Sequence, residues 1–377
     1  MGNIPFIFGK IAENGDFTDR EKEIEKLTNN FISLANTTIL SPRRWGKTSL
    51  VNKVAQKVMA EHKHIKVAFV DVFNVRDEKD FYFALVKSVF EATASKWEEM
   101  AENAKQFLAH FVPKISFSND VSEISFALEW SEMKKNVDDM LNLAERIAVK
   151  KKIRIIVCID EFQTISEFED PLVFQRKLRS NWQKHSHVGY CIYGSKRHML
   201  MEIFAKPSMP FYKFGDLMFL KKIETPVWQD FIVKRFYETQ KIISRENAKL
   251  IADLVENHSY YVQQLAQQSW LMCDKECTET DIRNAWQNII DQLSLLFVNI
   301  YESLPTLQHQ LLKAILAGEK HLSSQHTLTK YNLGTSAAIP RLRKSLLERE
   351  IIDIASKNEI DIQDPMFKAW LKKIYFG

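Results

Sequence analysis

The chain has 377 residues and a formal net charge of +4. That length suggests about two or three domains, since a single core rarely grows beyond about 250–300 residues. A hydrophobic share of 45% and a charged share of 27% exclude disordered and collagen-like classes. No run reaches about 18 uninterrupted apolar residues, the start lacks the pattern of a secretory signal, and four cysteines do not suggest a disulfide framework. We therefore expect a cytoplasmic protein without a membrane span.

The first 220 residues alternate short apolar runs with helix-like stretches. Val, Ile and Phe dominate the runs with little polar alternation, which is typical of strands buried on both faces. Strands that alternate with helices indicate an α/β fold with a parallel sheet. The predicted strands are Thr37–Leu40, Ile65–Val72, Ile153–Ile159, Val188–Tyr193 and Leu217–Leu220.

A long insert, at about residues 92–152, separates the second and third predicted strands. It reads as a helix, then a hairpin that pairs Ile115–Phe117 with Ile124–Leu128, then a charged helix. The sequence assigns this insert no role.

From Thr225 the pattern is helical. Thr225 and Pro226 suggest an N-cap followed by a proline in the first turn, and Ser244 suggests a second cap. Thr278 with Asp281 resembles a capping box that opens a long helix. We accordingly expect a core over residues 1–222, a helical lid over 223–290 and a third domain over 291–377.

The third domain is predicted to have a different order of elements. A helix from Thr306 to Ala317 stops at Gly318, and a short helix follows near Ser324–Tyr331. After a turn, a helix spans about 336–348, and the runs at 351–354 and 360–362 suggest a hairpin. This order is that of a winged helix-turn-helix.

A phosphate-binding loop is the strongest motif. The run SPRRWGKT at residues 41–48 follows a predicted strand and precedes an amphipathic helix, as a P-loop requires. Ser41 stands where the pattern has its first glycine, which an L-residue can replace only with an ordinary φ. Lys47 would reach the β- and γ-phosphates of a nucleotide, and the Thr48 hydroxyl would bind Mg²⁺. The residues expected around the phosphates are Ser41, Pro42, Arg43, Arg44, Trp45, Gly46, Lys47, Thr48 and Ser49.

A pair of acids ends the third predicted strand. Asp160 would hold the Mg²⁺ shell, so the expected metal ligands are Thr48 and Asp160. Glu161 would orient or deprotonate the attacking water. The two acids differ in role because successive strand residues point in opposite directions.

The fourth predicted strand ends at Gly194 and is followed by Ser195, Lys196 and Arg197. Ligands gather at the carboxyl ends of parallel strands, so we expect Ser195 beside the γ-phosphate. Lys196 or Arg197 could sense that phosphate or reach a neighbouring subunit, and the alternative is that both are surface cations. The expected catalytic residues are Lys47, Glu161, Ser195 and Arg197, while Arg43, Arg44, Arg176 and Arg179 remain open as arginine fingers.

A charged segment, Phe17–Glu23, precedes the first helix and would lie against the adenine, with Arg20 as a contact. By itself the segment is a capped helix start, with Thr18 or Asp19 as the N-cap. Cys158 and Cys191 read as buried packing residues.

These motifs together resemble the prokaryotic archaeal-type P-loop ATPases of the STAND group, near the AAA+ proteins. The residues that carry the resemblance are Phe17–Glu23, Pro42–Ser49, Ile159–Gln163, Gly194–His198 and Asn257–Tyr261. The resemblance implies a nucleotide-binding core, a helical lid and a winged helix, in proteins that often oligomerise when ATP is bound. The sequence departs from the family at Ser41, and also at Asn257 and Ser259, where the family usually has Gly-x-Pro.

The leading hypothesis is an ATPase that needs Mg²⁺ and whose nucleotide state changes domain arrangement or assembly. The expected ligands are ATP or ADP, and the expected partner is a second copy or another protein. One rival is a DNA-binding regulator or loader, supported by Arg341, Arg343 and Lys344 on the predicted recognition helix, although residues 291–377 carry only +2. Another rival is a nucleotide-binding scaffold, against which the intact loop and acid pair argue.

Overall fold

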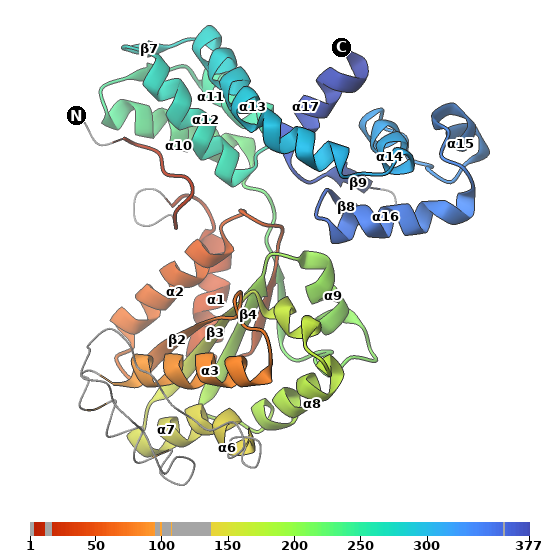
Figure 1. Cartoon of the computed structure of the whole chain (residues 1–377). Coiled ribbons are helices and arrows are strands. Elements are labelled where there is room, and N and C mark those ends of the chain that lie inside the picture. The colour runs from red at the N-terminus through yellow and green to blue at the C-terminus, as the bar shows by residue number, and fades with distance from the viewer. Residues whose placement is uncertain (1–3, 12–16, 95–98, 100–106, 108–136, 357–358) are drawn as a thin grey trace. The chain divides into compact units, whose positions relative to one another are not determined.

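The computed structural model describes residues 4–11, 17–94, 99, 107, 137–356 and 359–377 (Figure 1). The chain divides into two compact units. The core unit comprises Arg20–Arg43 and Lys47–Lys221. The C-terminal unit comprises Lys222–Gly377 together with Met1–Asp19 and the loop tip Arg44–Gly46.

The core unit contains a five-stranded sheet in the order β2-β3-β4-β1-β5, and every neighbouring pair is parallel. Every residue of β4 and β1 is buried, which explains why these runs lack polar alternation. The five predicted strands are confirmed with shifts of one residue at most at each end. Their bounds are β1 Thr37–Leu40, β2 Ile65–Asp71, β3 Arg154–Asp160, β4 Val188–Gly194 and β5 Asp216–Phe219.

Helices cover both faces of this sheet (Figure 1). Alternate residues such as Val70, Val157 and Ile192 join side chains of α3, α7 and α8 in one apolar core. The opposite face carries Cys158 and Cys191, which are fully buried as predicted. The helical segments are α1 Glu21–Ser33, α2 Lys47–Glu61, α3 Glu78–Thr93, α6 Val137–Leu141, α7 Leu143–Lys151, the 3₁₀ segment η2 Phe162–Glu167, α8 Pro171–Trp182 and α9 Arg197–Ala205.

The predicted insert is only partly described. Its beginning is the end of α3, and its final charged helix corresponds to α6 and α7. The predicted hairpin at 115–117 and 124–128 lies outside the described residues.

The C-terminal unit is mainly helical around one continuous apolar core. None of the described helices combines the length and apolar composition that a membrane span requires. The first part contains α10 Thr225–Glu238, β6 Ile242–Ile243, α11 Arg245–Leu254, α12 Ser259–Met272, β7 Glu276–Cys277 and α13 Glu279–Glu302. The second part contains α14 Thr306–Leu316, α15 Gln325–Tyr331, the 3₁₀ turn η3 Ser336–Ala338, α16 Ile339–Glu348, β8 Ile352–Ser356, β9 Glu359–Ile362 and α17 Pro365–Phe376.

This second part has the predicted winged-helix order. Gly318 adopts φ 80 after the end of α14, and Asn332 ends α15 in the left-handed region. β8 and β9 pair antiparallel as the predicted hairpin. Leu346 of α16 is fully buried, so this side of the helix packs inward.

Two predicted helix caps are correct. The Thr278 side chain accepts from the Asp281 backbone N–H, the Asp281 carboxylate binds back to Thr278, and both halves of the capping box are present. The Ser244 hydroxyl accepts from the Asn247 N–H at 3.0 Å and caps α11.

Two other predicted caps are wrong. Glu224, not Thr225, is the N-cap of α10, because Thr225 lies inside the helix and its hydroxyl hydrogen-bonds the Asn257 side chain. Neither Thr18 nor Asp19 caps α1. That position belongs to Arg20, which adopts a left-handed φ of 79° and makes no side-chain cap.

Candidate functional site

The loop between β1 and α2 makes its left-handed turns at Arg44 (φ 64) and Gly46 (φ 89). Ser41 is fully buried and keeps a φ outside the left-handed region, and its hydroxyl donates to the Pro42 carbonyl at 3.0 Å. The residue that replaces the first glycine of the motif therefore introduces no backbone strain. Instead, the loop needs φ > 0 at a non-glycine residue, Arg44, which is uncommon.

Lys47 and Thr48 are the first residues of α2. The Lys47 ammonium donates to the carbonyls of Ser41 at 3.2 Å and Pro42 at 2.9 Å, so it lies within the curve of the loop. Only 6% of Lys47 is exposed. The first turn of a helix leaves backbone N–H groups without helical partners, and these attract anions. Loop, ammonium and helix terminus together can hold phosphate groups.

The carboxylate of Asp160 lies beside this helix start. The Thr48 hydroxyl donates to Asp160 Oδ2 at 3.1 Å, and the Glu161 backbone N–H donates to Oδ1 at 2.8 Å. Burial, with the Glu161 carboxylate nearby, raises the pKa of Asp160 to about 6. A hydroxyl beside a carboxylate is a donor set of oxygens that suits Mg²⁺, which usually keeps several of its waters.

Glu161 follows β3 with φ 54, and its side chain is held by the end of β4. Its Oε2 accepts from the Ser195 hydroxyl at 2.9 Å, from the Ser195 N–H at 3.2 Å, and from the Gln163 amide. A Cβ at Gly194 would lie 1.9 Å from Gln163 Oε1, so a larger residue there would displace the Gln163 side chain from its present position. These hydrogen bonds occupy Glu161 Oε2, so an attacking water can bind this oxygen only if it replaces one of the present donors.

Gln163 is a residue whose role the sequence did not indicate. It is buried within η2 and contacts Glu161, two positions before it. A glutamine two residues after an acid is common in any sequence, so only the structure could show that it binds Glu161.

The predicted arginines and the neighbouring lysine have several different environments. Arg197 begins α9 next to Ser195, and Lys196 lies 3.4 Å from Glu167. Arg20 is buried, and its guanidinium donates to the Lys221 carbonyl at 2.7 Å and to Glu23. Of the remaining four, Arg43, Arg44 and Arg176 are exposed, and the Arg179 guanidinium lies 4.9 Å from the centre of the Phe214 ring.

The loop tip contacts other residues of the C-terminal unit. The Arg44 guanidinium lies 4.6 Å from the centre of the Tyr260 ring, and the Trp45 ring lies 5.8 Å from the Lys222 ammonium. The adjacent His258 is buried, and its surroundings lower its pKa to about 3, first through burial and then through nearby cations. It is therefore neutral at physiological pH.

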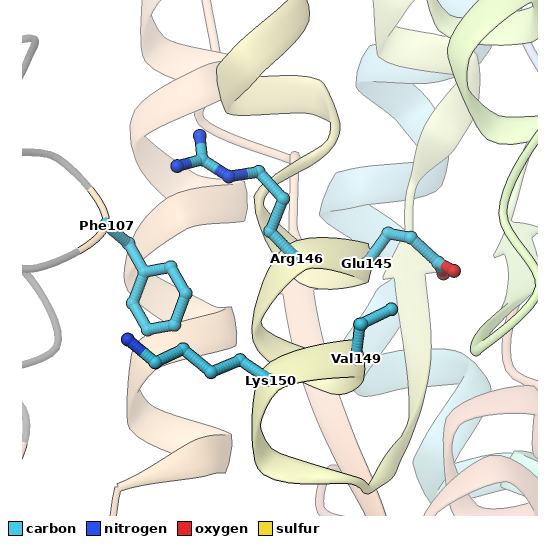
Figure 2. Close-up of a pocket in the computed structure, with 5 residues that line it drawn as sticks. All are labelled: Phe107, Glu145, Arg146, Val149 and Lys150. Carbon is cyan, nitrogen blue, oxygen red and sulfur yellow. The ribbon is translucent and has the colours of Figure 1, made fainter.

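A separate cavity of about 420 Å³ lies along α7 (Figure 2). Its lining includes Glu145, Arg146, Val149 and Lys150 of α7, with the Lys150 ammonium 5.2 Å from the centre of the Phe107 ring. None of the predicted site residues lines it.

Comparison with known proteins places the chain in a family. Residues 17–265, more than half of the chain, match the family described as an ATPase domain predominantly from Archaea, and the chain belongs to this family. Residues 295–373 match a family described as a probable winged helix domain. The protein is an ATPase with a C-terminal winged-helix domain. Comparison of the chain with curated proteins found no match.

Solved structures share the fold at low sequence identity. The Walker-type ATPase PABY2304 of Pyrococcus abyssi has a TM-score of 0.65 at 15% identity, over 98% of this chain and 99% of that one. The ORC2 protein of Aeropyrum pernix, solved as ADPNP–ADP complexes, has a TM-score of 0.60 at 15% identity, over 99% and 96%. The ORC1 protein of Aeropyrum pernix in complex with DNA has a TM-score of 0.50 at 13% identity, over 95% and 93%.

Proposed function

We propose that this ATPase binds ATP with Mg²⁺ and acts as a switch whose nucleotide state controls domain arrangement or assembly. The observation that carries the proposal is the hydrogen bond between Thr48 and Asp160, which joins the phosphate loop to the acid pair. Lys47 lies in the same loop, and Glu161 follows Asp160 directly. We assign nucleotide hydrolysis to these four side chains, and the Thr48–Asp160 hydrogen bond supports that assignment.

Each side chain has a distinct proposed role. Lys47 binds the β- and γ-phosphates, Thr48 and Asp160 hold Mg²⁺, and Ser195 contacts the γ-phosphate. Mg²⁺, when bound, neutralises charge that develops on the phosphate oxygens. Glu161 orients the attacking water and accepts its proton after exchanging its bond from Ser195 for one from the water.

The proposed switch has three parts: the core at 1–222, the lid at 223–290 and the winged helix at 291–377. The hydrogen bonds from Ser195 and Gln163 to Glu161 support a resting arrangement in which the base is occupied. Engagement of Ser195 by a γ-phosphate would free Glu161, so the triphosphate and diphosphate states would differ at this point.

Mass measurement in solution tests the switch. We expect the Glu161→Gln protein, which should retain ATP, to form a larger assembly with ATP than with ADP or without nucleotide. Light scattering over a range of protein concentrations measures the mass, and identification of co-purifying molecules reveals a partner. Identical masses in all three states at every concentration would contradict the switch. The matched control is Lys47→Ala, whose mass should not respond to ATP.

DNA binding is the second candidate function. Arg341 and Lys344 are exposed on α16 while Leu346 is buried, as in a helix that presents one face outward. ORC1 of Aeropyrum pernix, which shares the fold, was solved with DNA. The modest charge of residues 291–377 argues for weak binding.

A further inference from the structure

Three side chains form a row across the carboxyl edge of the sheet. Asp71 ends β2 and is the register partner of Asp160, and the Val72 N–H donates to the Asp160 carbonyl at 3.2 Å. Ile159 pairs with Ile192, so the next residues, Asp160 and Tyr193, also lie side by side. Neighbouring strands are about 4.8 Å apart, and residues in register on parallel strands point to the same face.

That face is the one from which α2 approaches Asp160. Thr48, on the first turn of α2, binds the Asp160 carboxylate. Asp71 and Tyr193 therefore flank Asp160 on the side where the expected cation ligands meet.

Tyr193 is buried, with 2% of its surface exposed. No described residue makes a hydrogen bond to its hydroxyl. Burial, followed by the charges of neighbours that include Asp160 and Asp71, raises the pKa of Tyr193 well above its usual range, so the hydroxyl keeps its proton. A tyrosine hydroxyl without a protein partner can accept a hydrogen bond from water.

One carboxylate oxygen of Asp71 accepts a hydrogen bond. Its Oδ1 accepts from the Phe73 N–H at 2.9 Å, which closes a turn after β2. In the part of the chain that the structure describes, no donor reaches its Oδ2. Asp71 is exposed, so this oxygen is accessible to water.

We propose that Asp71 and Tyr193 complete the cation site by accepting hydrogen bonds from waters that Mg²⁺ retains. The inference rests on the proposed function and assigns two further residues to it. Mg²⁺ gives up its waters reluctantly and is held by few direct protein ligands, so acceptors for those waters contribute to its affinity. Loss of such an outer partner typically weakens metal affinity by about 10- to 100-fold.

Manganese binding provides the test, because Mn²⁺ bound to the protein–ADP complex can be counted by electron paramagnetic resonance without turnover. Asp71→Asn keeps the acceptor for the Phe73 N–H, and Tyr193→Phe removes only the hydroxyl. We expect each variant to bind Mn²⁺ about 10-fold more weakly or worse. Their ADP affinity in excess chelator should equal that of the wild type. Glu61→Gln, which neutralises an exposed acid at the end of α2, is the matched control and should bind Mn²⁺ normally.

The outcomes separate this inference from the proposed function. If Asp160→Asn loses Mn²⁺ while Asp71→Asn and Tyr193→Phe bind it within twofold of wild type, the inference is wrong and the proposed cation site stands. If the wild-type complex with ADP binds no Mn²⁺, the proposed function is wrong at this point and the inference with it. Circular dichroism checks that each variant is folded.

Discussion

The Ser195 hydroxyl donates to Glu161 Oε2 at 2.9 Å, which joins the carboxyl ends of β4 and β3 through one short contact. The residue expected to contact the γ-phosphate therefore holds the residue expected to act as the base. A change of partner at Ser195 would therefore free a carboxylate oxygen of Glu161 to bind another donor.

The first prediction concerns that base. Glu161→Gln should slow ATP hydrolysis by about 10²-fold or more, as expected for the loss of a general base, while ATP affinity stays within a few fold. Single-turnover hydrolysis and equilibrium binding measure the two effects. Glu169→Gln, which changes an exposed acid eight residues further on, is the control and should be unaffected. Near-normal turnover in Glu161→Gln would assign the base to another residue.

The second prediction concerns the loop lysine. Lys47→Ala should weaken ATP binding by roughly 100-fold or more, since charge-assisted contacts to two phosphates are lost. Calorimetric titration of the folded variant measures this. Lys57→Ala removes an exposed cation from the same helix and should bind ATP normally. An unchanged ATP affinity in Lys47→Ala would contradict the assignment of this loop as a phosphate-binding loop.

The third prediction concerns pH. Cation binding requires ionised Asp160, whose pKa is raised to about 6, so Mn²⁺ affinity should fall about tenfold per pH unit below that value and level off above it. Without a bound cation, the contribution of Asp160 to folding stability has the opposite pH dependence. Its folded-state pKa exceeds the ordinary 3.8, so this carboxyl stabilises the fold most below pH 3.8. That contribution is lost as pH rises to about 6. Titrations at pH 5, 6, 7 and 8 check the first effect, and a flat profile would contradict it.

The fourth prediction concerns the edge strand β5. A Cβ at Gly215 would lie 2.0 Å from the Asn36 carbonyl oxygen, the acceptor from the Asp216 N–H at 2.8 Å. Gly215→Ala should therefore destabilise the core unit by about 1–3 kcal/mol, because backbone must move. Urea unfolding measures the loss. Asn29→Ala, an exposed change on α1, should stay within about 0.5 kcal/mol of wild type, and equal stability of the two variants would contradict the argument.

The fifth prediction concerns DNA. If Arg341, Arg343 and Lys344 all contact phosphates, the logarithmic salt slope would be only about −3, with a non-specific Kd of ~10⁻⁴–10⁻⁶ M. Lys344 also lies 3.7 Å from Glu348, which reduces its availability. Mobility-shift titration of the full chain at two salt concentrations measures the slope. Replacing Arg341 and Lys344 by alanine should reduce binding more than replacing Lys372 and Lys373 on α17. Nanomolar, sequence-selective binding that resists salt would make DNA recognition the leading function.

Local sequence patterns determined much of the fold and of the candidate site. The buried strands of the core, the phosphate loop before α2, the acids after β3 and the winged-helix order were all predictable, because each depends on residues adjacent in the chain. The Thr278–Asp281 capping box is likewise a local pattern with one geometric solution.

Tertiary structure decided what distant segments do to one another. Thr225 is a residue type that often caps helices, but its hydroxyl hydrogen-bonds the Asn257 side chain. Arg20 precedes α1, but its guanidinium donates to the carbonyl of the distant Lys221. The row of Asp71, Asp160 and Tyr193 follows from strand register. Register depends on how whole faces of the sheet pack, since a shift of one residue moves every side chain to the other face. Residues far apart in sequence meet only after that packing is complete, so no local pattern contains their pairing.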